Sequence, residues 1–379
     1  MNKEPTNQSV EGANQYLQQG TKLNPRSTLV MLPKPASAAP ASITLANGLA
    51  MLLLAAFEVR GAEPIAHTSL ENPSVRFTAP GKPYVVLRRG SIEAVIVDNR
   101  AVDDAVLPGH RAGYHGIGSL KHDEQPRNLC VPAYAGLNFE HIHDGAVQTN
   151  KVLFEPRHAP MELRVIDSHT AELYQAPTPH WGLESCMRYQ LLEDETIQLT
   201  FECIARRDTY KNGYIGLFWA SYIDQPESRD THFLIPPGHT ETGPKWVRAS
   251  SPQHGVLAAH RAENDNRAFA HDANFPLTLV FNYSNHRYAE PWFLGVCRQM
   301  AFVQIFQPQD KVRLSQSPSG GGAGNPAWDF QWILPDYKIG QRYRLVMRAL
   351  YTINEANPLN PFESQDRLLA AVRRAGKFE

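Results

Sequence analysis

Residues 186–203 read CMRYQLLEDETIQLTFEC and predict a β-hairpin folded around an acidic turn at 193–195. Apolar and polar side chains alternate on both sides of the turn, which is the period of strands that bury one face in a core. If the apolar side chains of both strands lie on one face of the hairpin, Leu191 lies opposite Ile197, and this pair fixes the rest of the register. The hairpin therefore predicts an antiparallel sheet with one buried face.

The chain has four cysteines, Cys130, Cys186, Cys203 and Cys297. In the register above, Cys203 lies on the apolar face beside Ser185, whereas Cys186 lies on the polar face. A shift of one residue would pair these two cysteines but would remove every apolar contact of the hairpin. We therefore predict that Cys186 and Cys203 are not bonded to each other.

Strand-like segments continue from about residue 83 almost to the C-terminus; they are short, rich in β-branched or aromatic residues, and bounded by Gly, Pro, Asn or Asp. Besides the hairpin they span residues 84–87, 92–97, 151–155, 161–166, 171–174, 214–223, 232–235, 277–283, 300–306, 311–314, 330–334 and 343–351. A short helix is expected from a cap at Ser364 to Arg374. The pattern predicts an all-β fold, a large antiparallel β-sandwich with a short C-terminal helix.

Composition and charge describe an ordinary globular protein. Hydrophobic residues make up 42% of the chain, and 37 Lys and Arg balance 38 Asp and Glu. No cluster or stripe of basic residues occurs, so a nucleic-acid partner is not expected.

An apolar run at residues 43–57 (ITLANGLAMLLLAAF) is short for a membrane span and suits the core of a signal peptide. With cleavage after Ala62, residues 1–62 form an N-terminal extension with the export segment, and residues 63–379 form a single β-sandwich domain. Translation from Met31 and an uncleaved membrane anchor stay open as alternatives. The protein is expected to be exported, periplasmic or extracellular, and to meet a membrane only through an uncleaved export segment.

The region 110–143 contains five histidines among glycines, tyrosines and carboxylates, a mixture that suits a polar cleft. On a strand, His141 and His143 would face one side and Glu140 and Ile142 the other. The two imidazoles could act on a substrate as acid and hydrogen-bond donor, or hold a divalent metal. A metal would need a third ligand, for which the candidates are His110, His115, His180 and His286.

A glycine-flanked polar loop at 109–116 reads GHRAGYHG. Glycines let the backbone approach a ligand closely, and Arg111 offers a planar fork of donors. His110, Arg111 and Tyr114 are therefore expected to bind substrate. The alternative is a tight turn whose glycines supply positive φ angles.

The turn PHWGLE places His180 and Trp181 ahead of Glu184. Glu184 shares the polar face of the hairpin with Arg188 and Glu202. This face is expected either to be a solvated ion-pair surface or to line a cleft, in which Glu184 would be a general base.

The strand at 214–223 (YIGLFWASYI) has two apolar faces of different character. One face, expected in the core, carries Ile215, Leu217, Trp219 and Ile223; the other carries Tyr214, Phe218 and Tyr222. The second face could stack on sugar rings. His286, in the polar-aromatic sequence NHRY, is a further candidate for sugar binding.

The segment 187–223, MRYQLLEDETIQLTFECIARRDTYKNGYIGLFWASYI, resembles the central hairpin and following strand of the galactose mutarotase-like superfamily, which includes aldose 1-epimerases. The resemblance covers residues 80–352 and implies a β-supersandwich with a sugar as ligand. It breaks off where epimerases carry Asn-His, because this chain has Trp219 and Ala220 there. The epimerase acid is therefore not carried over.

Together these observations predict an exported carbohydrate-active protein with a histidine-rich concave cleft. As an epimerase or mutarotase (an isomerase), it would use His141 or His143 as acid and Glu184 as base. The binding groups would be His110, Arg111, Tyr114, His180, Trp181, Tyr222 and His286. A non-catalytic carbohydrate-binding module, or a polysaccharide lyase or glycoside hydrolase, is the alternative. No cofactor is firmly implied, and a metal would sit on His141 and His143. The prediction requires the histidine-rich segment and the turn at Trp181 to border a common hollow.

Overall fold

The computed structural model describes residues 67–238, 243–322, 324–354 and 366–378, all within the unit Arg60–Glu379. The expected export segment lies outside these residues, so the leader, the division at residue 62 and the destination of the chain stay predictions. In the described ranges, no helix is both long and apolar enough to cross a bilayer.

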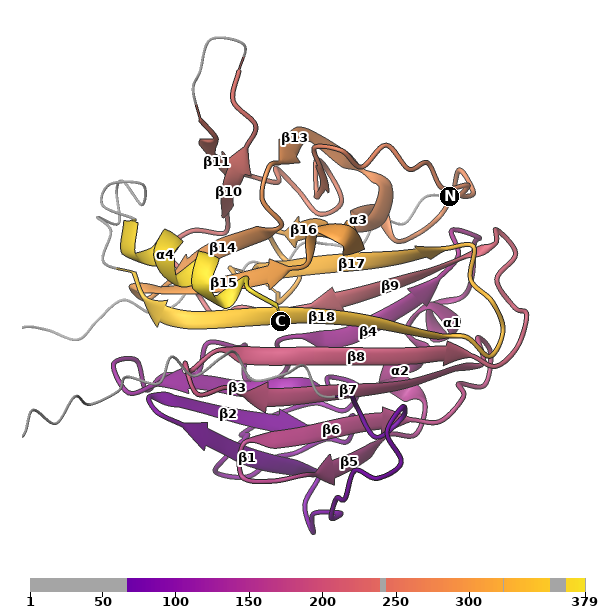
Figure 1. Cartoon of the computed structure of the whole chain (residues 1–379), viewed down its shortest axis with the longest axis vertical. Coiled ribbons are helices and arrows are strands. Elements are labelled where there is room, and N and C mark those ends of the chain that lie inside the picture. Colours follow the sequence, from indigo (N-terminus) through magenta and orange to yellow (C-terminus); the bar gives the residue numbers. More distant parts are fainter. Residues whose placement is uncertain (1–66, 239–242, 323, 355–365, 379) are drawn as a thin grey trace, which may run out of the picture. The chain divides into compact units, whose positions relative to one another are not determined.

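Strands dominate the described residues and form three sheets, in which every named strand pair except β12–β13 is antiparallel (Figure 1). The nine-stranded sheet has the order β11-β10-β14-β15-β18-β8-β7-β6-β5 and consists of β5 (Glu162–Val165), β6 (Thr170–Gln175), β7 (Leu183–Leu191), β8 (Ile197–Ala205), β10 (Thr231–Ile235), β11 (Lys245–Ala249), β14 (Trp292–Cys297), β15 (Met300–Phe306) and β18 (Arg342–Ile353). The six-stranded sheet has the order β13-β12-β16-β17-β9-β4 and consists of β4 (Asn138–His143), β9 (Tyr214–Ala220), β12 (Ala259–Ala262), β13 (Tyr283–Tyr288), β16 (Arg313–Ser317) and β17 (Ala327–Pro335).

The three-stranded sheet and a few short helices complete the fold. The sheet consists of β1 (Tyr84–Arg89), β2 (Ile92–Val97) and β3 (Gly116–His122). The helices are α1 (Asn150–Leu153), α2 (Glu155–His158), α3 (Thr278–Phe281) and α4 (Asp366–Ala375), with a 3₁₀ turn at Pro308–Asp310. The predicted all-β antiparallel sandwich with a short C-terminal helix is confirmed.

The register of the β7–β8 hairpin is the one that the apolar alternation predicts. Leu191 pairs with Ile197, and Cys203 pairs with Ser185. Cys186 pairs with Glu202, so the two cysteines lie on opposite faces of the sheet, as expected. All four cysteines of the chain are free and buried.

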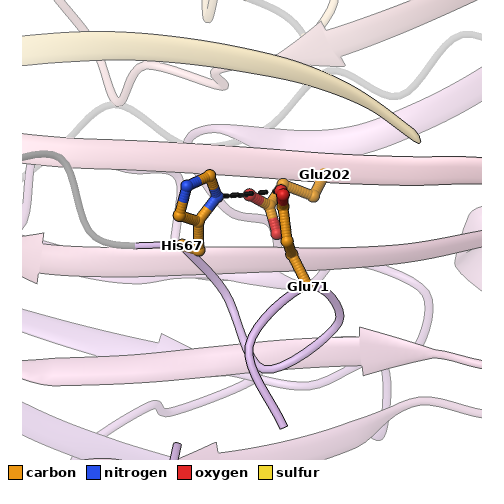
Figure 2. A group of neighbouring side chains, drawn as sticks. All are labelled: His67, Glu71 and Glu202. Carbon is orange, nitrogen blue, oxygen red and sulfur yellow. Dashed lines mark hydrogen bonds and ion pairs between the residues drawn. The ribbon is translucent and has the colours of Figure 1, made fainter.

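The polar face of this hairpin is covered by the segment 67–72 (Figure 2). Glu202 is fully buried and accepts hydrogen bonds from the Thr68 backbone N–H at 3.2 Å and from its hydroxyl at 2.6 Å. His67 Nδ1 lies 3.0 Å from the other oxygen of Glu202. Arg188 is buried too. The face is thus a covered polar layer, and the expected solvated ion-pair surface is wrong.

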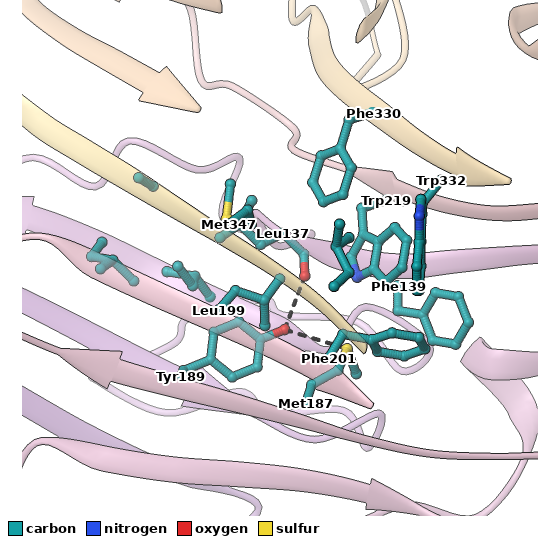
Figure 3. Close-up of a cluster of buried hydrophobic side chains, with 14 of the residues drawn as sticks. Leu137, Phe139, Met187, Tyr189, Leu199, Phe201, Trp219, Phe330, Trp332 and Met347 are labelled. Atoms are coloured by element: carbon teal, nitrogen blue, oxygen red, sulfur yellow. Dashed lines mark hydrogen bonds between the residues drawn. The ribbon is translucent and has the colours of Figure 1, made fainter. Parts of the chain in front are cut away.

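The main core lies between the nine-stranded and six-stranded sheets. Trp219 of β9 stacks between Phe139 of β4 and Phe330 of β17, with ring centroids 4.9 Å and 5.0 Å away. Phe201 of β8, in the other sheet, meets Trp219 edge-on at 4.9 Å. These rings therefore join the two sheets (Figure 3).

The two faces of β9 differ as the sequence predicts. Leu217 and Trp219 lie in the core between the sheets. Phe218 and the following Tyr222 belong to a separate apolar cluster that includes Val280 of α3. The six-stranded sheet therefore has a second packed layer on its outer face.

Two segments expected to be strands, 151–155 and 277–283, contain short helices instead. Pro156 lies in the first turn of α2 and has no N–H for a strand ladder. In α3, the Val280 carbonyl accepts a hydrogen bond from Gln331 Nε2 at 2.9 Å, so a side chain of the sheet replaces a neighbouring strand. Short apolar runs look alike in helices and strands, which is why the sequence pattern failed here.

The C-terminal helix forms as predicted, although the expected cap Ser364 lies outside the described residues. Leu368 and Val372 of α4 bury one face in an apolar cluster, and the helix packs against β15 and β18 (Figure 1). Strands β3, β11, β12, β13 and β14 were not expected.

We expect the replacement of Trp219 by Ala to lower the free energy of unfolding by about 3–5 kcal/mol, because it leaves a cavity between three aromatic rings. Val147, with 50% of its side chain exposed, provides the control, and Val147→Ala should change stability by less than about 0.5 kcal/mol. Urea unfolding followed by circular dichroism measures both. Equal effects would contradict a central role for the stack.

Candidate functional site

A β-bulge in β4 sets the geometry of the site. Phe139 and His141 pair with successive residues of β9, so Glu140 is an extra residue without a partner there. The bulge turns Glu140 to the same outer face as His141, and both line one cavity. The predicted separation of Glu140 from His141 is therefore wrong, whereas Ile142 lies in the core as expected.

The cavity has a volume of about 290 Å³ and lies on the outer face of the six-stranded sheet. Side chains of β4, β9 and β17 form its floor, and residues of α3 and beside α1 form its walls. This volume is at the lower end of the range for small-molecule sites, ~300–1,000 Å³. Its polar lining includes Glu140, His141, Asn150, Tyr222, His254 and Asp329.

Glu140 is a buried carboxylate held by two donors. Arg157 Nη1 lies 3.1 Å from Glu140 Oε1, and the Tyr222 hydroxyl donates a hydrogen bond to the same oxygen. His141 Nε2 is 3.5 Å from the other oxygen. Burial raises the pKa of Glu140, while the charge of Arg157 and both hydrogen bonds act in the opposite direction.

Asp329 of β17 is a second buried carboxyl in the same cavity, with less support for a negative charge. It accepts one hydrogen bond from the Ser221 backbone N–H, at 3.2 Å. Burial, and then the charge of Glu140, raise the pKa of Asp329 well above its ordinary value. Of the two carboxyl groups, Asp329 is therefore the one that holds a proton more readily, and Glu140 beside Arg157 is the one that ionises more readily.

The two histidines of β4 occupy different environments. His141 lines the cavity and packs against the rings of Phe154 at 4.1 Å and Phe218 at 5.2 Å. His143 is fully buried against Phe275 at 5.3 Å and does not line the cavity. Burial lowers the pKa of both, to about 3 for His143. Near pH 7 both imidazoles are thus neutral and have no extra proton to give.

Gly216 of β9 provides the space for the His143 ring. A Cβ atom at Gly216 would lie 2.1 Å from His143 Cε1, which no side chain can do without displacing the ring. Neither ring nitrogen of His143 has a hydrogen-bond partner among the described protein atoms. His143 is therefore an uncharged polar ring enclosed by aromatic neighbours.

The glycine-flanked loop reaches the cavity indirectly. His110 bonds through Nε2 to the Tyr114 carbonyl at 2.7 Å, and Arg111 lies 6.0 Å from the ring of Tyr134. The Tyr114 ring packs under the Arg157 guanidinium at 3.9 Å and edge-on to Tyr222 at 5.6 Å. Of the residues expected to bind substrate, His110, Arg111 and Tyr114 therefore do not line the cavity, and Tyr222 does.

The turn at Trp181 does not share this cavity. Trp181 is fully buried, stacks on Tyr210 at 5.0 Å and donates from Nε1 to the Val152 carbonyl at 2.9 Å. The backbone N–H groups of His180 and Trp181 donate to the Glu155 carboxylate at 2.6 Å and 3.0 Å. The turn thus supports α1 and α2, and the expectation that it borders a common hollow with the histidine-rich segment is wrong for this cavity.

Glu184 and His286 also lie outside the lining. Glu184 is on β7 of the other large sheet and accepts hydrogen bonds from Tyr174 at 2.7 Å and Arg206 at 2.6 Å. His286 is on β13, with its ring 6.5 Å from that of Phe233. The structure therefore does not bring Glu184 to the cavity histidines, and the roles assigned to these residues stay predictions.

Sequence reasoning gave no catalytic role to the two carboxyl groups that line the cavity, although the stretch 325–332 around Asp329 was noted as polar-aromatic material suited to sugars. Asp329 lies in the stretch WDFQW, where it alternates with aromatic residues and so shares the outer face with Gln331. This alternation could have predicted that Asp329 faces away from the aromatic core. The bulge at Glu140 leaves no comparable trace, and Arg157 follows a segment that was expected to be a strand.

His67, Glu71 and Glu202 form a group of metal-type donors on the outer face of the nine-stranded sheet (Figure 2). Their ligand atoms lie within 4.8 Å of one another, so the group could hold a cation. However, Arg344 Nη1 lies 3.2 Å from His67 Nδ1, and Arg342 Nη2 lies 3.7 Å from Glu71. One guanidinium therefore already pairs with Glu71, and a second lies against the His67 ring.

For the metal considered at His141 and His143, the described residues provide no third His, Cys, Asp or Glu ligand. Within the described ranges, the group of His67, Glu71 and Glu202 is where three such donors meet at this distance, and it contains neither histidine.

Comparison with known proteins gives structural likeness only. No family model matches the chain, and no curated protein matches it. Similar solved structures include galactose 1-epimerase from Lactobacillus acidophilus, with 8% identity, a TM-score of 0.39, and coverage of 73% of this chain and 98% of that one. Alpha-N-acetylgalactosaminidase from Bifidobacterium bifidum has 12% identity, a TM-score of 0.41, and coverage of 77% and 39%.

A heparan sulfate lyase from Pedobacter heparinus is also similar, with 9% identity, a TM-score of 0.32, and coverage of 74% of this chain and 38% of the lyase. An epimerase of the kind resembled by the sequence is thus among the matches. At such identities and TM-scores, the likeness says nothing about which reaction this chain catalyses.

The depressed pKa of His143 makes stability depend on pH. Below about pH 6.5 the imidazole of His143 is protonated in the unfolded chain, whereas in the folded chain it stays neutral until about pH 3. The free energy of unfolding therefore falls as the pH drops through this window. We expect His143→Phe to reduce this loss by roughly 1.4 kcal/mol per pH unit. Urea unfolding at several pH values measures the slope. An unchanged slope in His143→Phe would refute the prediction.

Proposed function

We propose that this chain is an exported carbohydrate-active protein that binds a sugar in the cavity of the six-stranded sheet and exchanges protons with it. Asp329 is the acid and Glu140 the base. The observation that carries this proposal is the presence of two buried carboxyl groups with unequal support for charge in one cavity. Such unequal pairs are a recurrent basis of acid–base catalysis.

The cavity lining suits a sugar ring. Phe154 and Phe218 offer flat apolar surfaces, and carboxyl, imidazole and hydroxyl groups converge beside them. At the rim, the exposed His254 bonds through Nδ1 to the Ser317 hydroxyl at 2.9 Å. A sugar ring held between these groups would pack its apolar face against the phenyl rings and form hydrogen bonds through its hydroxyls.

The reaction supported best is ring opening and closure at the anomeric carbon, the chemistry of a mutarotase. Ionised Glu140 takes the proton of the anomeric hydroxyl while protonated Asp329 gives its proton to the ring oxygen, so the ring C–O bond breaks and a carbonyl forms. The reverse transfer closes the ring on either face. Neutral His141 serves as a hydrogen-bonding group for a hydroxyl of the sugar.

Exchange of the two carboxyl groups for amides tests this assignment. We expect Glu140→Gln and Asp329→Asn each to reduce kcat/KM by ~10²–10⁴-fold, with sugar binding retained, because proton transfer is lost while the hydrogen-bonding shape persists. Glu184→Gln, at the carboxylate that sequence reasoning favoured, should keep full activity. Anomer exchange by NMR across a panel of free aldoses gives the rates, and titration calorimetry gives the binding.

Two outcomes would contradict the enzymatic assignment. Binding of sugars without anomer exchange by the wild-type protein would indicate a binding module. Loss of activity in Glu184→Gln, with full activity in both cavity variants, would instead indicate that the catalytic carboxylate is Glu184 of the nine-stranded sheet.

Export is supported by the apolar run at 43–57 and by the small residues Gly61 and Ala62 at the expected cleavage site. We expect the protein recovered outside the cytoplasm of its native cell to begin at Glu63, as measured by intact mass. A chain that retains residues 43–57 and sediments with membranes would instead indicate an anchor.

A further inference from the structure

We infer that Arg157 is a positioning residue that keeps Glu140 ionised and oriented, and that the glycine-flanked loop 109–116 holds Arg157 in place. The inference rests on the proposed function for its catalytic meaning. Its structural content, control of the charge on Glu140, can be measured without any substrate.

Arg157 is the cation that faces Glu140. Its Nη1 lies 3.1 Å from Glu140 Oε1, and the two side chains are 15% and 6% exposed, so water screens the pair little. The cavity lining includes no lysine or arginine of its own. Arg157 therefore acts from behind the carboxylate and leaves the ligand side of Glu140 free.

The other titratable groups around Glu140 cannot replace this charge. His141, 3.5 Å away on β4, is buried and neutral, and Tyr222 contributes a hydrogen bond without a charge. Asp329 on β17 and Tyr114 on the glycine-flanked loop bring no positive charge, and ionised Asp329 would oppose a second anion. A single guanidinium thus decides which carboxyl of the pair is charged.

The glycine-flanked loop fixes the Arg157 side chain from two sides. Arg157 Nε donates to the Gly113 carbonyl at 2.8 Å, and the guanidinium lies 3.9 Å from the centroid of the Tyr114 ring. A planar fork can satisfy the carbonyl, the ring and the carboxylate together, whereas a lysine ammonium cannot. The glycine-flanked loop therefore influences Glu140 through Arg157.

The conformation of Gly113 is part of this support. Its φ is +86°, and a Cβ atom there would lie 3.4 Å from both Arg157 Nε and the Arg157 carbonyl oxygen. Gly109, in the same loop, has a φ of +72° but nothing within 4 Å of a built Cβ. Alanine at either position therefore strains the backbone, but only at Gly113 is the strained residue the one whose carbonyl accepts a hydrogen bond from Arg157.

The test is a direct titration of Glu140 by ¹³C NMR of labelled carboxyl groups, assigned with Glu140→Gln. We expect Arg157→Met to raise the Glu140 midpoint by ~1–3 pH units, because a nearby opposite charge is lost. Arg157→Lys should recover part of that shift. On active protein, the acidic limb of the pH profile of kcat/KM should move in the same direction.

Arg164→Met is the matched control. Arg164 is 12% exposed, pairs with Glu162 at 2.7 Å and stacks on Tyr174 at 3.9 Å, but it belongs to β5 of the other large sheet. This variant loses the same kinds of contact and should leave the Glu140 midpoint unchanged. Gly113→Ala should shift the midpoint upward, and Gly109→Ala should not.

An unchanged Glu140 midpoint in a folded Arg157→Met variant would overturn the inference. If that variant does not fold, Arg157→Lys and Gly113→Ala decide: unchanged midpoints in both overturn it, and an upward shift in either, with the Gly109→Ala midpoint unchanged, supports it. A wild-type protein without anomer exchange would defeat the proposed function but not the titration result, so the two failures are distinguishable.

Discussion

The aromatic stack of Phe139, Trp219 and Phe330 is the constraint on which the site depends. These rings align three neighbouring strands of the six-stranded sheet and press them against the other large sheet. Because strand side chains alternate, fixing one face to the core fixes what the opposite face presents. Glu140 and Asp329 come directly after and before two of the stacked rings in sequence, so the packing of the core places both carboxyl groups on the outer face.

The β-bulge in β4 gives the outer face of the six-stranded sheet two adjacent polar side chains. Without the bulge, β4 would present only every second residue to the cavity, and Glu140 and His141 could not both face it. With it, Glu140 and His141 stand side by side on the outer face. A bulge leaves one residue without ladder partners, and such features are common beside functional sites. The disruption is local, since Ile142 returns to the core.

Buried carboxyl groups on the two outer faces of the sandwich differ in the number of hydrogen bonds that they accept. Beneath the segment 67–72, Glu202 accepts two hydrogen bonds from Thr68, so the carboxylate is satisfied and the network holds the segment in place. In the cavity, Asp329 has a single backbone donor. A fully satisfied polar group indicates a structural role, whereas an under-satisfied one in a cavity is available to a ligand.

The sequence by itself determined the strand class, the register of the β7–β8 hairpin and the two faces of β9, because side-chain alternation is a local property of the chain. It also singled out the histidine-rich region and Tyr222. Only the tertiary structure decided that Glu140 faces outward, that Asp329 joins it from a strand far along the chain, and that Arg157 stands behind it. A period of two specifies a face, but neither the neighbours of a strand nor the place of an inserted residue. The loss of water around buried groups, which sets their charges, exists only once distant strands have met.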